Sequence, residues 1–373
     1  IPPKITVVSA AGLLFEWKGF NILSDPWMVG PCMLGSWTNY PPELGINDLP
    51  KLDAIWISHE HSDHYHEPTL SYLDKNIPVY ITKFDDGHLV ARLSKLGFNN
   101  IIQIKTGEPM FLTDEVQLTS FKSASIWNDS ISYWKFGNFT ILNVNDAGFN
   151  WTIKDVVGKV DVICQQFTGP TSSYPFAWTH LDEAEKQRIQ IGMNNGMLNM
   201  MKSVTEICQA EYVLPFANFF ELANPEHSKY DQIMIKNSLR QVVKFFHNTK
   251  VKVLDLIPGE SWDGKFNRVP NREKFFDENF MGKYLKEKHE TEKKMGFKPT
   301  VFDIEHEEIK EYFEALSGSK LTKNVGLYRI SFIAKDENKS LKALITFDNG
   351  KVKYEPVLHP KRSEMTMSCP GGI

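Results

Sequence analysis

The chain has 373 residues, of which 42% are hydrophobic and 24% are charged, values typical of a globular protein with a sizeable core. A formal net charge of −4 and the lack of a sustained basic run argue against nucleic acid or an anionic membrane surface as the main partner. No apolar stretch approaches the roughly 20 residues needed to cross a bilayer. We predict one large domain over residues 1–265 and a smaller one over residues 266–373.

The four cysteines, Cys32, Cys164, Cys208 and Cys369, lie singly along the chain, with no Cys-x-x-Cys pair. Cys164 and Cys208 fall in apolar runs, where reduced core cysteines are common. We therefore expect a reducing compartment and a cytoplasmic location. The chain opens at Ile1 without an initiator methionine, which is compatible with the removal of an earlier segment.

Residues 5–23 are predicted to form short strands joined by tight turns, because apolar β-branched runs alternate with turn residues. The stretch 29–50 is broken repeatedly by glycine and proline and is predicted to be a long loop. Long loops often carry ligand contacts, so Trp27 and Trp37 are candidate walls of a substrate pocket. The alternative is that these aromatic rings pack as ordinary anchors.

Residues 58–66 hold the densest group of reactive side chains, with four of the eleven histidines and two acids in nine residues. They follow the apolar run 53–57, which we interpret as a buried strand. In an extended segment His59 and His61 point to one side, and imidazole and carboxylate ligands suit zinc, iron or manganese. Asp63 and His64 follow as donors for a second ion. The alternative is a solvated histidine-rich loop without metal.

The rest of the first domain reads as an alternation of strands and helices. Helices are expected over residues 67–75, 88–96 and 182–208, and strands over residues 78–81, 101–104, 116–121, 131–136, 139–144, 160–164, 212–217 and 251–255. The strand 139–144 leads into Asp146, an acid placed where ligands gather in layered α/β folds. A turn aspartate is the alternative. The loop 165–179 adds Tyr174 and Trp178 as candidate pocket walls.

Beyond residue 264 the composition becomes richer in charge. We predict helices over residues 274–298 and 304–316 and three strands over residues 325–358. This region is interpreted as a small α+β appendage, and no chemistry is identified in it.

A strand followed by His59-x-His61-x-Asp63-His64, with an acid at the end of a later strand, resembles the metallo-β-lactamase superfamily. The resemblance implies an α+β fold, an αββα sandwich, with a dinuclear metal site at one edge of two packed sheets. It also implies that His59 and His61 hold the first metal, that Asp63 and His64 hold the second, and that Asp146 bridges them.

Within that superfamily, five stretches resemble the cytidine-monophosphate N-acetylneuraminate hydroxylase group: residues 23–27, 57–64, 141–146, 215–217 and 258–259. A Rieske iron–sulfur domain accompanies that group. The Cys-x-His and Cys-x-x-His pairs that such a cluster requires do not occur in this chain. We therefore expect an oxygenase of this kind to receive electrons from a separate electron-donor protein.

The chain departs from the superfamily pattern at two positions. A third histidine is expected roughly 20 residues before the bridging aspartate, yet no histidine occurs between residues 89 and 179. By register this position falls on Ser125, and Asp129 is a candidate substitute ligand. The last histidine is expected near Asn224 by register, with His227 three residues later. We favour His227 as the ligand and keep Asn224 as the alternative.

The expected cofactor is a pair of metal ions, iron rather than zinc, with a single metal as the alternative. Such a site, short of imidazole and rich in carboxylate, suits an iron oxygenase that acts on a small polar metabolite. The first alternative is a zinc hydrolase of an ester, amide or phosphoester, in which Asp63 steers the attacking water as a catalytic residue. The second is a binding protein with a degenerate site.

Overall fold

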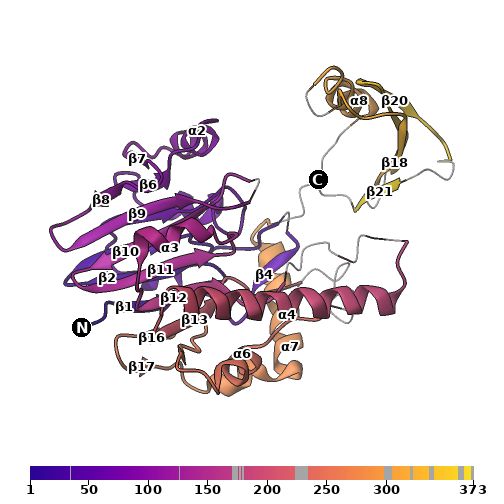
Figure 1. Ribbon diagram of the computed structural model, residues 1–373. Helices are drawn as coiled ribbons and strands as arrows, with labels where there is room; N and C mark the ends of the chain where they lie inside the picture. Colours follow the sequence, from indigo (N-terminus) through magenta and orange to yellow (C-terminus); the bar gives the residue numbers. More distant parts are fainter. Residues whose placement is uncertain are drawn as a thin grey trace. The chain divides into compact units, whose positions relative to one another are not determined.

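A computed structural model describes residues 1–33, 35–125, 127–169, 175, 178, 180–222, 234–297, 305–319, 322–335, 340–359 and 365–370 (Figure 1). The chain forms two compact units, Ile1–Met295 and Gly296–Ile373. The boundary expected at residue 265 lies within the first unit. Among the described residues no helix combines the length and the apolarity that a membrane crossing requires.

The first unit contains two large mixed sheets. One has the strand order β17-β16-β1-β2-β3-β5-β6-β7 and the other has the order β15-β13-β12-β11-β10-β9-β8. The strands of the first sheet are β1 (Lys4–Val7), β2 (Leu13–Trp17), β3 (Phe20–Ser24), β5 (Ala54–Ile57), β6 (Val79–Thr82), β7 (Ile101–Ile104), β16 (Ser261–Trp262) and β17 (Phe266–Asn267). Those of the second are β8 (Pro109–Phe111), β9 (Val116–Lys122), β10 (Ser130–Phe136), β11 (Phe139–Asn145), β12 (Val162–Gln166), β13 (Tyr212–Phe216) and β15 (Lys252–Val253).

Helices and a small strand pair complete this unit. The strand pair joins β4 (Trp37–Asn39) and β14 (Phe220–Leu222). The α-helices are α1 (Glu67–Tyr72), α2 (His88–Lys95), α3 (Lys154–Val157), α4 (Glu183–Ile207), α6 (Leu239–Phe246) and α7 (Glu278–Lys294), and the 3-10 helices are η1 (Ile46–Asp48), η2 (Trp151–Ile153) and η3 (Arg272–Phe276).

Alternating side chains on β5 sort the core into layers. Trp56 faces the second sheet and meets Trp134 with ring centroids 6.3 Å apart, while the neighbouring Ile55 and Ile57 belong to a separate core cluster on the other face. Successive residues of a strand point to opposite faces, so a strand buried on both faces reads as a continuous apolar run. Phe15 of β2 also contacts Trp134, at 5.8 Å.

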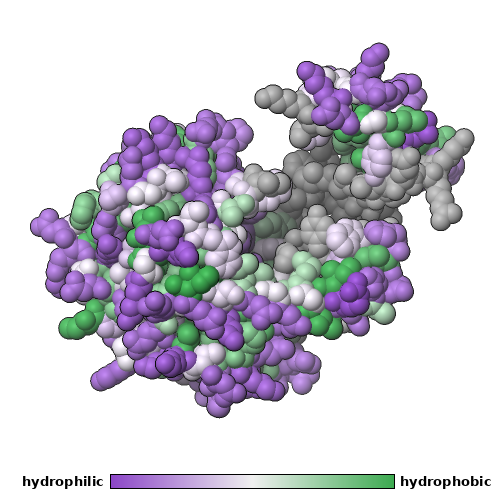
Figure 2. Space-filling view, in the orientation of Figure 1, coloured by the Kyte–Doolittle hydropathy of each residue, from purple (hydrophilic) through white to green (hydrophobic). Residues whose placement is uncertain are grey.

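Helices cover the outer face of each sheet. Leu70 of α1 and Leu93 of α2 share the cluster of Ile57, whereas Met201 of α4 and Val242 of α6 pack with the second sheet. In Figure 1, α2 lies beside β7, and α4 runs along β12. The face shown in Figure 2 is mainly hydrophilic, with single hydrophobic side chains scattered over it. The layers are helix, sheet, sheet and helix, which confirms the predicted αββα sandwich.

Parallel strands bring reactive segments to one edge of the sandwich. β3, β5 and β6 are parallel neighbours, as are β11, β12 and β13. The carboxyl ends of parallel neighbours meet at one edge, where ligands commonly bind in layered folds. His59 follows the end of β5 and Asp146 follows the end of β11. The fold therefore carries both predicted parts of the site to strand ends.

Most predicted elements are present within a few residues of their expected ends. The elements that the sequence did not indicate are short or depend on distant partners: β4, β8, β14, β16, β17, β21, α3 and α6. The region 29–50 is less irregular than expected, because it contains η1 and β4. Strands of two or three residues carry too little periodicity to be recognised from sequence alone.

α7 belongs to the first unit because its carboxyl-terminal half is anchored on the segment around β4. The hydroxyl of Thr38 donates to Glu292 Oε2 at 3.1 Å, and Lys288 forms an ion pair with Glu43. Glu292 is buried. These contacts join positions more than 240 residues apart, which explains why the unit extends to residue 295.

The described residues of the second unit form a four-stranded sheet and a helix, an α+β arrangement as predicted for the appendage. Its sheet order is β20-β19-β18-β21. Ile309 and Phe313 of the helix pack against a core that includes Phe332 and Tyr354. The elements are α8 (His306–Glu314), β18 (Tyr328–Lys335), β19 (Ser340–Asp348), β20 (Lys351–Pro356) and β21 (Met365–Pro370).

The anchor of α7 predicts a pH-dependent stability. Burial raises the pKa of Glu292 to about 7, so the folded protein holds this proton more tightly than the unfolded chain. The stabilising contribution is complete below the ordinary glutamate pKa and is lost as pH rises through about 7. We expect Glu292→Gln to raise the free energy of unfolding by roughly 1–2 kcal/mol at about pH 8, and to change it little at about pH 4. Urea unfolding of the wild type and the variant at the two pH values measures these free energies.

The exposed Glu287 on the same helix supplies a matched control, because Glu287→Gln should not alter the pH dependence. A Glu292→Gln variant whose stability follows the wild-type pH profile would contradict the assignment.

Candidate metal centre

His59 and His61 turn ring nitrogens toward each other. His59 Nε2 lies 2.8 Å from His61 Nδ1, and the ring of His59 is buried while that of His61 is exposed. Both histidines are on the segment that follows β5, where their alternation brings the rings to one side, as predicted. Two converging imidazole nitrogens are an arrangement in which both lone pairs can bind one metal ion.

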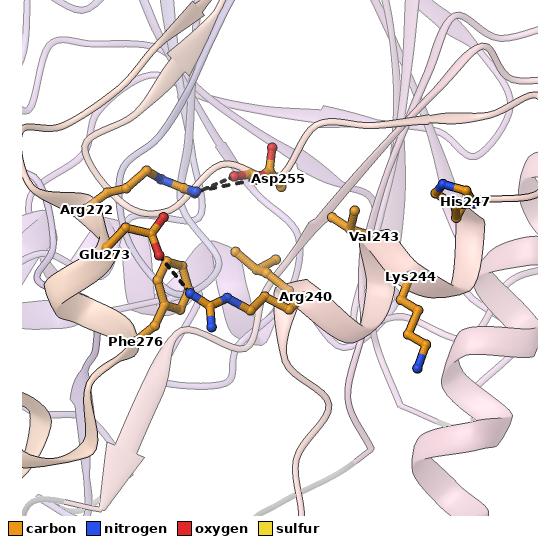
Figure 3. A pocket seen from close by; sticks show the side chains of 9 residues that line it. Arg240, Val243, Lys244, His247, Asp255, Arg272, Glu273 and Phe276 are labelled. Carbon is orange, nitrogen blue, oxygen red and sulfur yellow. Dashed lines mark hydrogen bonds and ion pairs between the residues drawn. The ribbon is translucent and has the colours of Figure 1, made fainter.

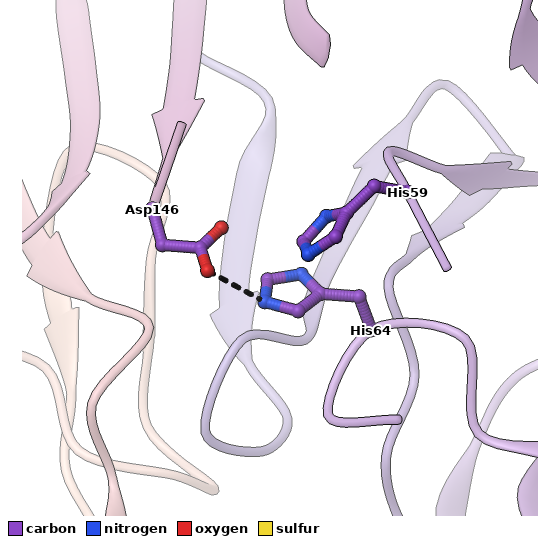
Figure 4. A group of neighbouring side chains, drawn as sticks. All are labelled: His59, His64 and Asp146. Carbon is purple, nitrogen blue, oxygen red and sulfur yellow. Dashed lines mark ion pairs between the residues drawn. The ribbon is translucent and has the colours of Figure 1, made fainter. Parts of the chain in front are cut away.

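His64 stands between two carboxylates. Its Nε2 lies 3.2 Å from Asp63 Oδ2 and 3.4 Å from Asp146 Oδ2. One donor atom from each of His59, His64 and Asp146 falls within 4.8 Å of the others, and Figure 4 shows the three side chains pointing toward one another. The structure therefore brings together His59, His61, Asp63, His64 and Asp146 from the predicted set.

Three polar atoms of this group are buried without a hydrogen-bond partner among the described residues: Asp63 Oδ1, His64 Nε2 and Asp146 Oδ1. Buried polar atoms are normally paired, and an unpaired buried carboxylate oxygen is costly. A bound cation would satisfy such atoms, and a mixed nitrogen and oxygen donor set suits zinc, iron or manganese. The residues present therefore fit the metal site that the sequence predicts.

The protonation of the centre also favours positive charge at its middle. Burial alone would lower the pKa of His64, but Asp146 and Asp63 raise it well above its usual value. Burial alone would raise the pKa of Asp63 and Asp146, but the charge of His64 holds both below their usual range. Burial, with repulsion from His64, lowers the pKa of His59 to about 4. His64 thus holds a proton where the carboxylates attract a cation.

Asp25, at the end of β3, organises the backbone below the centre. Its Oδ1 accepts a hydrogen bond from the Ser58 amide at 2.7 Å, and its Oδ2 accepts from the Ser58 hydroxyl at 2.7 Å and from Asn145 Nδ2 at 2.9 Å. The same Oδ2 lies 3.2 Å from His64 Nδ1, the ring nitrogen opposite the one that faces Asp63. Asp25 therefore orients His64 and ties together the ends of β3, β5 and β11.

Asp25 and Asn145 both have positive φ angles, 44° and 63°. Non-glycine residues in this region store backbone strain that the surrounding structure must hold. The sequence analysis did not assign a role to either residue. A sequence feature that could have indicated such a role is a polar residue at the end of an otherwise apolar strand. It occurs in Leu23-Ser-Asp and in Asn143-Val-Asn-Asp.

Ser125 and Asp129, the candidate substitutes for the third histidine, occupy different places. The Ser125 hydroxyl bonds within its own loop, to Ser123 Oγ at 2.6 Å and to the Trp127 carbonyl at 3.3 Å. Asp129 is buried, with Oδ1 3.3 Å from His59 Nδ1. Burial, with the charge of Asp146, raises the pKa of Asp129 to about 8.

The remaining predicted positions separate into three groups. His227, Asn224 and Tyr174 lie outside the described residues, so their roles stay predictions. Trp27 is fully buried, and Trp37 stacks on Phe220 with centroids 3.8 Å apart, so both pack within the protein as the alternative interpretation proposed. Trp178 is 37% exposed.

Two exposed tryptophans near the centre were not singled out by the sequence analysis. Trp127 is 68% exposed and Trp151 is 43% exposed. Their loops are joined by a 3.1 Å hydrogen bond from the Ala124 amide to the Gly148 carbonyl. Since the first loop also carries Asp129 and the second begins after Asp146, both indoles lie on loops that follow residues of the centre in the chain. Their exposure depends on tertiary packing, which the sequence does not reveal.

Figure 3 shows a separate cavity of about 380 Å³ between α6 and η3. Four of its charged side chains form ion pairs: Arg240 contacts Glu273 at 2.7 Å and Arg272 contacts Asp255 at 3.5 Å. None of the residues of the metal centre lines it. This cavity therefore belongs to a different surface of the first unit.

Residues 20–190 match the family model described as the β-lactamase superfamily domain. The first unit carries a β-lactamase superfamily domain. The match spans the segments of the centre from Asp25 to Asp146, which agrees with the resemblance noted from the sequence.

The chain is 26% identical over 264 residues to the cytidine monophosphate-N-acetylneuraminic acid hydroxylase of Danio rerio. This match covers 68% of the chain but 44% of the relative, so the chain spans less than half of the relative's length. A Mycolicibacterium smegmatis protein described as a Rieske 2Fe-2S iron–sulfur protein is 34% identical over 103 residues, which cover 27% of the chain and 20% of that protein.

A solved structure described as a possible metal-dependent hydrolase from Veillonella parvula has a TM-score of 0.52 and is 15% identical to the chain. It covers 70% of this chain and 99% of its own. At this identity the likeness concerns the fold alone. It supports the assignment of the β-lactamase superfamily architecture to the first unit.

The Asp25 network predicts a large loss of stability on truncation. Asp25→Ala removes a buried carboxylate that accepts from the Ser58 amide, the Ser58 hydroxyl and Asn145 Nδ2. We expect the free energy of unfolding to fall by about 3 kcal/mol or more, measured by urea unfolding.

Asp53→Ala is the control, because Asp53 is half-buried and receives a hydrogen bond from the Asn21 amide; its loss should cost about 1 kcal/mol. Equal costs for the two variants would show that Asp25 does not organise the strand ends.

Proposed function

We propose that the protein is an iron-dependent oxygenase that hydroxylates a small polar metabolite. The observation that carries the proposal is the convergence of His59, His61, Asp63, His64 and Asp146 at the strand ends of a β-lactamase superfamily domain whose curated relatives include hydroxylases. In this proposal His59 and His61 would hold one iron and Asp63 and His64 a second, with Asp146 as a ligand that both could share and His227 as the last ligand.

Bound iron would supply the activation of dioxygen. The protein's own residues orient and shield the centre. Asp25 fixes the ring of His64, the buried surroundings limit water at His59, and Asp63 presents a carboxylate oxygen that can accept a proton. The exposed indoles of Trp127 and Trp151, which lie on loops close in sequence to Asp129 and Asp146, are candidate substrate contacts. Aromatic faces of this kind bind flat or weakly polar surfaces of a ligand.

The balance of donors favours an oxygenase over a hydrolase. Among the described residues, the imidazoles at the centre are those of His59, His61 and His64, and the register position of the missing histidine is occupied by Ser125, whose hydroxyl bonds within its loop. A coordination position left open in a carboxylate-rich set suits oxygen-activating iron. The alternative is a zinc hydrolase in which Asp63 steers water. It uses the same residues, so the bound metal and the reaction catalysed distinguish the two functions.

An electron donor and a reducing location complete the proposal. The match to a protein described as a Rieske protein supports an electron-donor protein as the partner. The described cysteines Cys32, Cys164 and Cys208 are free and buried, which accords with a cytoplasmic location. A sugar nucleotide is a candidate substrate because of the substrate in the hydroxylases' name.

The deciding experiment compares iron-loaded and zinc-loaded protein. Metal-free protein is loaded anaerobically with Fe²⁺ or with Zn²⁺, and oxygen uptake is followed with a chemical reductant and cytidine monophosphate-N-acetylneuraminic acid as the first substrate tested. We expect about two irons per chain, and oxygen uptake by the iron form alone. Ester or phosphoester hydrolysis by the zinc form, without oxygen uptake by the iron form, would overturn the proposal in favour of the hydrolase.

The cluster itself is tested by His61→Ala. Loss of the imidazole facing His59 should remove about one metal equivalent per chain, because a single remaining nitrogen cannot hold the first ion. Elemental analysis after purification without chelator measures this content. His247→Ala is the control, since His247 is exposed and its Nδ1 lies near Asn248 rather than at the centre. Unchanged metal in His61→Ala would count against the assigned ligands.

A further inference from the structure

We infer that Asp129 is a positioning residue that holds His59 from the outer side of its ring, and that it does not replace the missing third histidine as a ligand. This inference rests on the proposed metal centre. It assigns a defined task to the loop between β9 and β10, on which the expected histidine is absent.

The two nitrogens of His59 face different partners. Nε2 lies 2.8 Å from His61 Nδ1, so this side of the ring is directed to the centre. Nδ1 lies 3.3 Å from Asp129 Oδ1. The lone-pair directions of the two ring nitrogens diverge, so a carboxylate that contacts Nδ1 lies outside the ion that Nε2 binds. Because Oδ1 also accepts from the Ser130 amide, it stays an acceptor when Asp129 carries a proton on Oδ2. It can therefore accept the outer N–H of a metal-bound His59 and fix the orientation of the ring.

Neighbouring acceptors define which nitrogen of His59 carries the hydrogen. Nδ1 also lies 3.0 Å from Ser58 Oγ. The Ser58 hydroxyl donates its hydrogen to Asp25 Oδ2 at 2.7 Å, so its oxygen can act as an acceptor toward His59. With acceptors from Ser58 and Asp129 at Nδ1, the hydrogen belongs on Nδ1, and the lone pair of Nε2 is free for a metal.

The loop holds Asp129 in a fixed place. The Asp129 amide donates to the Trp127 carbonyl at 2.9 Å, and its carbonyl accepts from the Ser123 amide at 2.9 Å. Asp129 Oδ1 also accepts from the amide of Ser130 at 2.6 Å, and the Ser130 hydroxyl donates to the Ser58 carbonyl at 2.6 Å. The loop is thus attached to the residue that precedes His59, which fixes both members of the pair relative to each other.

The two buried histidines of the centre, His59 and His64, each have an aspartate oxygen close to Nδ1. His64 has Asp25 at its outer nitrogen, at 3.2 Å, and His59 has Asp129 at 3.3 Å. The rings of both are buried, whereas His61 is exposed. An outer carboxylate orients a ligand that cannot be oriented by water, and it increases the basicity of the nitrogen that faces the metal.

Cobalt binding tests this inference without use of activity. Co²⁺ is titrated into metal-free wild type, Asp129→Ala, Asp129→Asn and His59→Ala, with a competing chelator for affinity and the visible absorption spectrum for coordination. We expect Asp129→Ala to bind as many Co²⁺ as the wild type, with affinity reduced about 10- to 100-fold and with a shifted spectrum. Asp129→Asn, which keeps an acceptor oxygen, should recover most of the affinity. Asp85→Ala, a change of an exposed acid, is the control.

Two results would overturn the positioning role while leaving the metal centre intact. Loss of a full Co²⁺ equivalent in Asp129→Ala, matching His59→Ala, would make Asp129 a ligand. Wild-type affinity and spectrum in Asp129→Ala would show that Asp129 does not act on His59. A wild type that binds no Co²⁺ would instead overturn the proposed centre together with this inference. If Asp129→Ala fails to fold, the same affinity and spectrum are measured on Asp129→Ser, whose shorter side chain removes the carboxyl oxygen from His59 Nδ1 and should show the same loss.

Discussion

The carboxylate of Asp25 is the constraint on which the site depends. It is fully buried at the end of β3 and accepts hydrogen bonds from Ser58 after β5 and from Asn145 at the end of β11. Three strands from two sheets are thereby held at one edge. His59 directly follows Ser58, and Asp146 directly follows Asn145. Buried charges are tolerated when hydrogen bonds satisfy them, so the network that stabilises this edge also fixes the geometry of the donors.

An excess of buried acid gives the edge its chemical character. Asp146, Asp63 and Asp25 contact His64 and raise its pKa well above the usual value. A cation at this place relieves the repulsion among carboxylates more completely than one imidazolium proton. Asp63 Oδ1 and Asp146 Oδ1 are buried without a hydrogen-bond partner among the described residues. The acidic surroundings of His64 and the unpaired buried oxygens therefore both favour a bound metal ion. The superfamily domain positions these side chains at one edge of the sandwich.

The parts of the site that follow from local sequence were predictable. His59 and His61 alternate directly after an apolar strand, and Asp146 ends another strand, so both could be placed before the structure was considered. The roles of Asp25 and Asn145 were not, because they arise from pairing between strands distant in sequence. The same limit applies to α7, whose Glu292 reaches β4. The same limit explains why two of the predicted pocket tryptophans are not exposed. Tertiary packing decides which indoles are exposed, and it buries Trp27 and Trp37 but leaves Trp127 exposed.

The central claim is that these donors hold a dinuclear metal centre of iron. The most direct measurement is a crystal structure of the anaerobically loaded protein with anomalous diffraction recorded on both sides of the iron absorption edge. The account predicts two iron peaks, one bound by His59 Nε2 and His61 Nδ1 and the other by Asp63 and His64, with Asp146 between them. Crystals of folded protein with no anomalous peak among these side chains, or with iron bound by other residues, would contradict it.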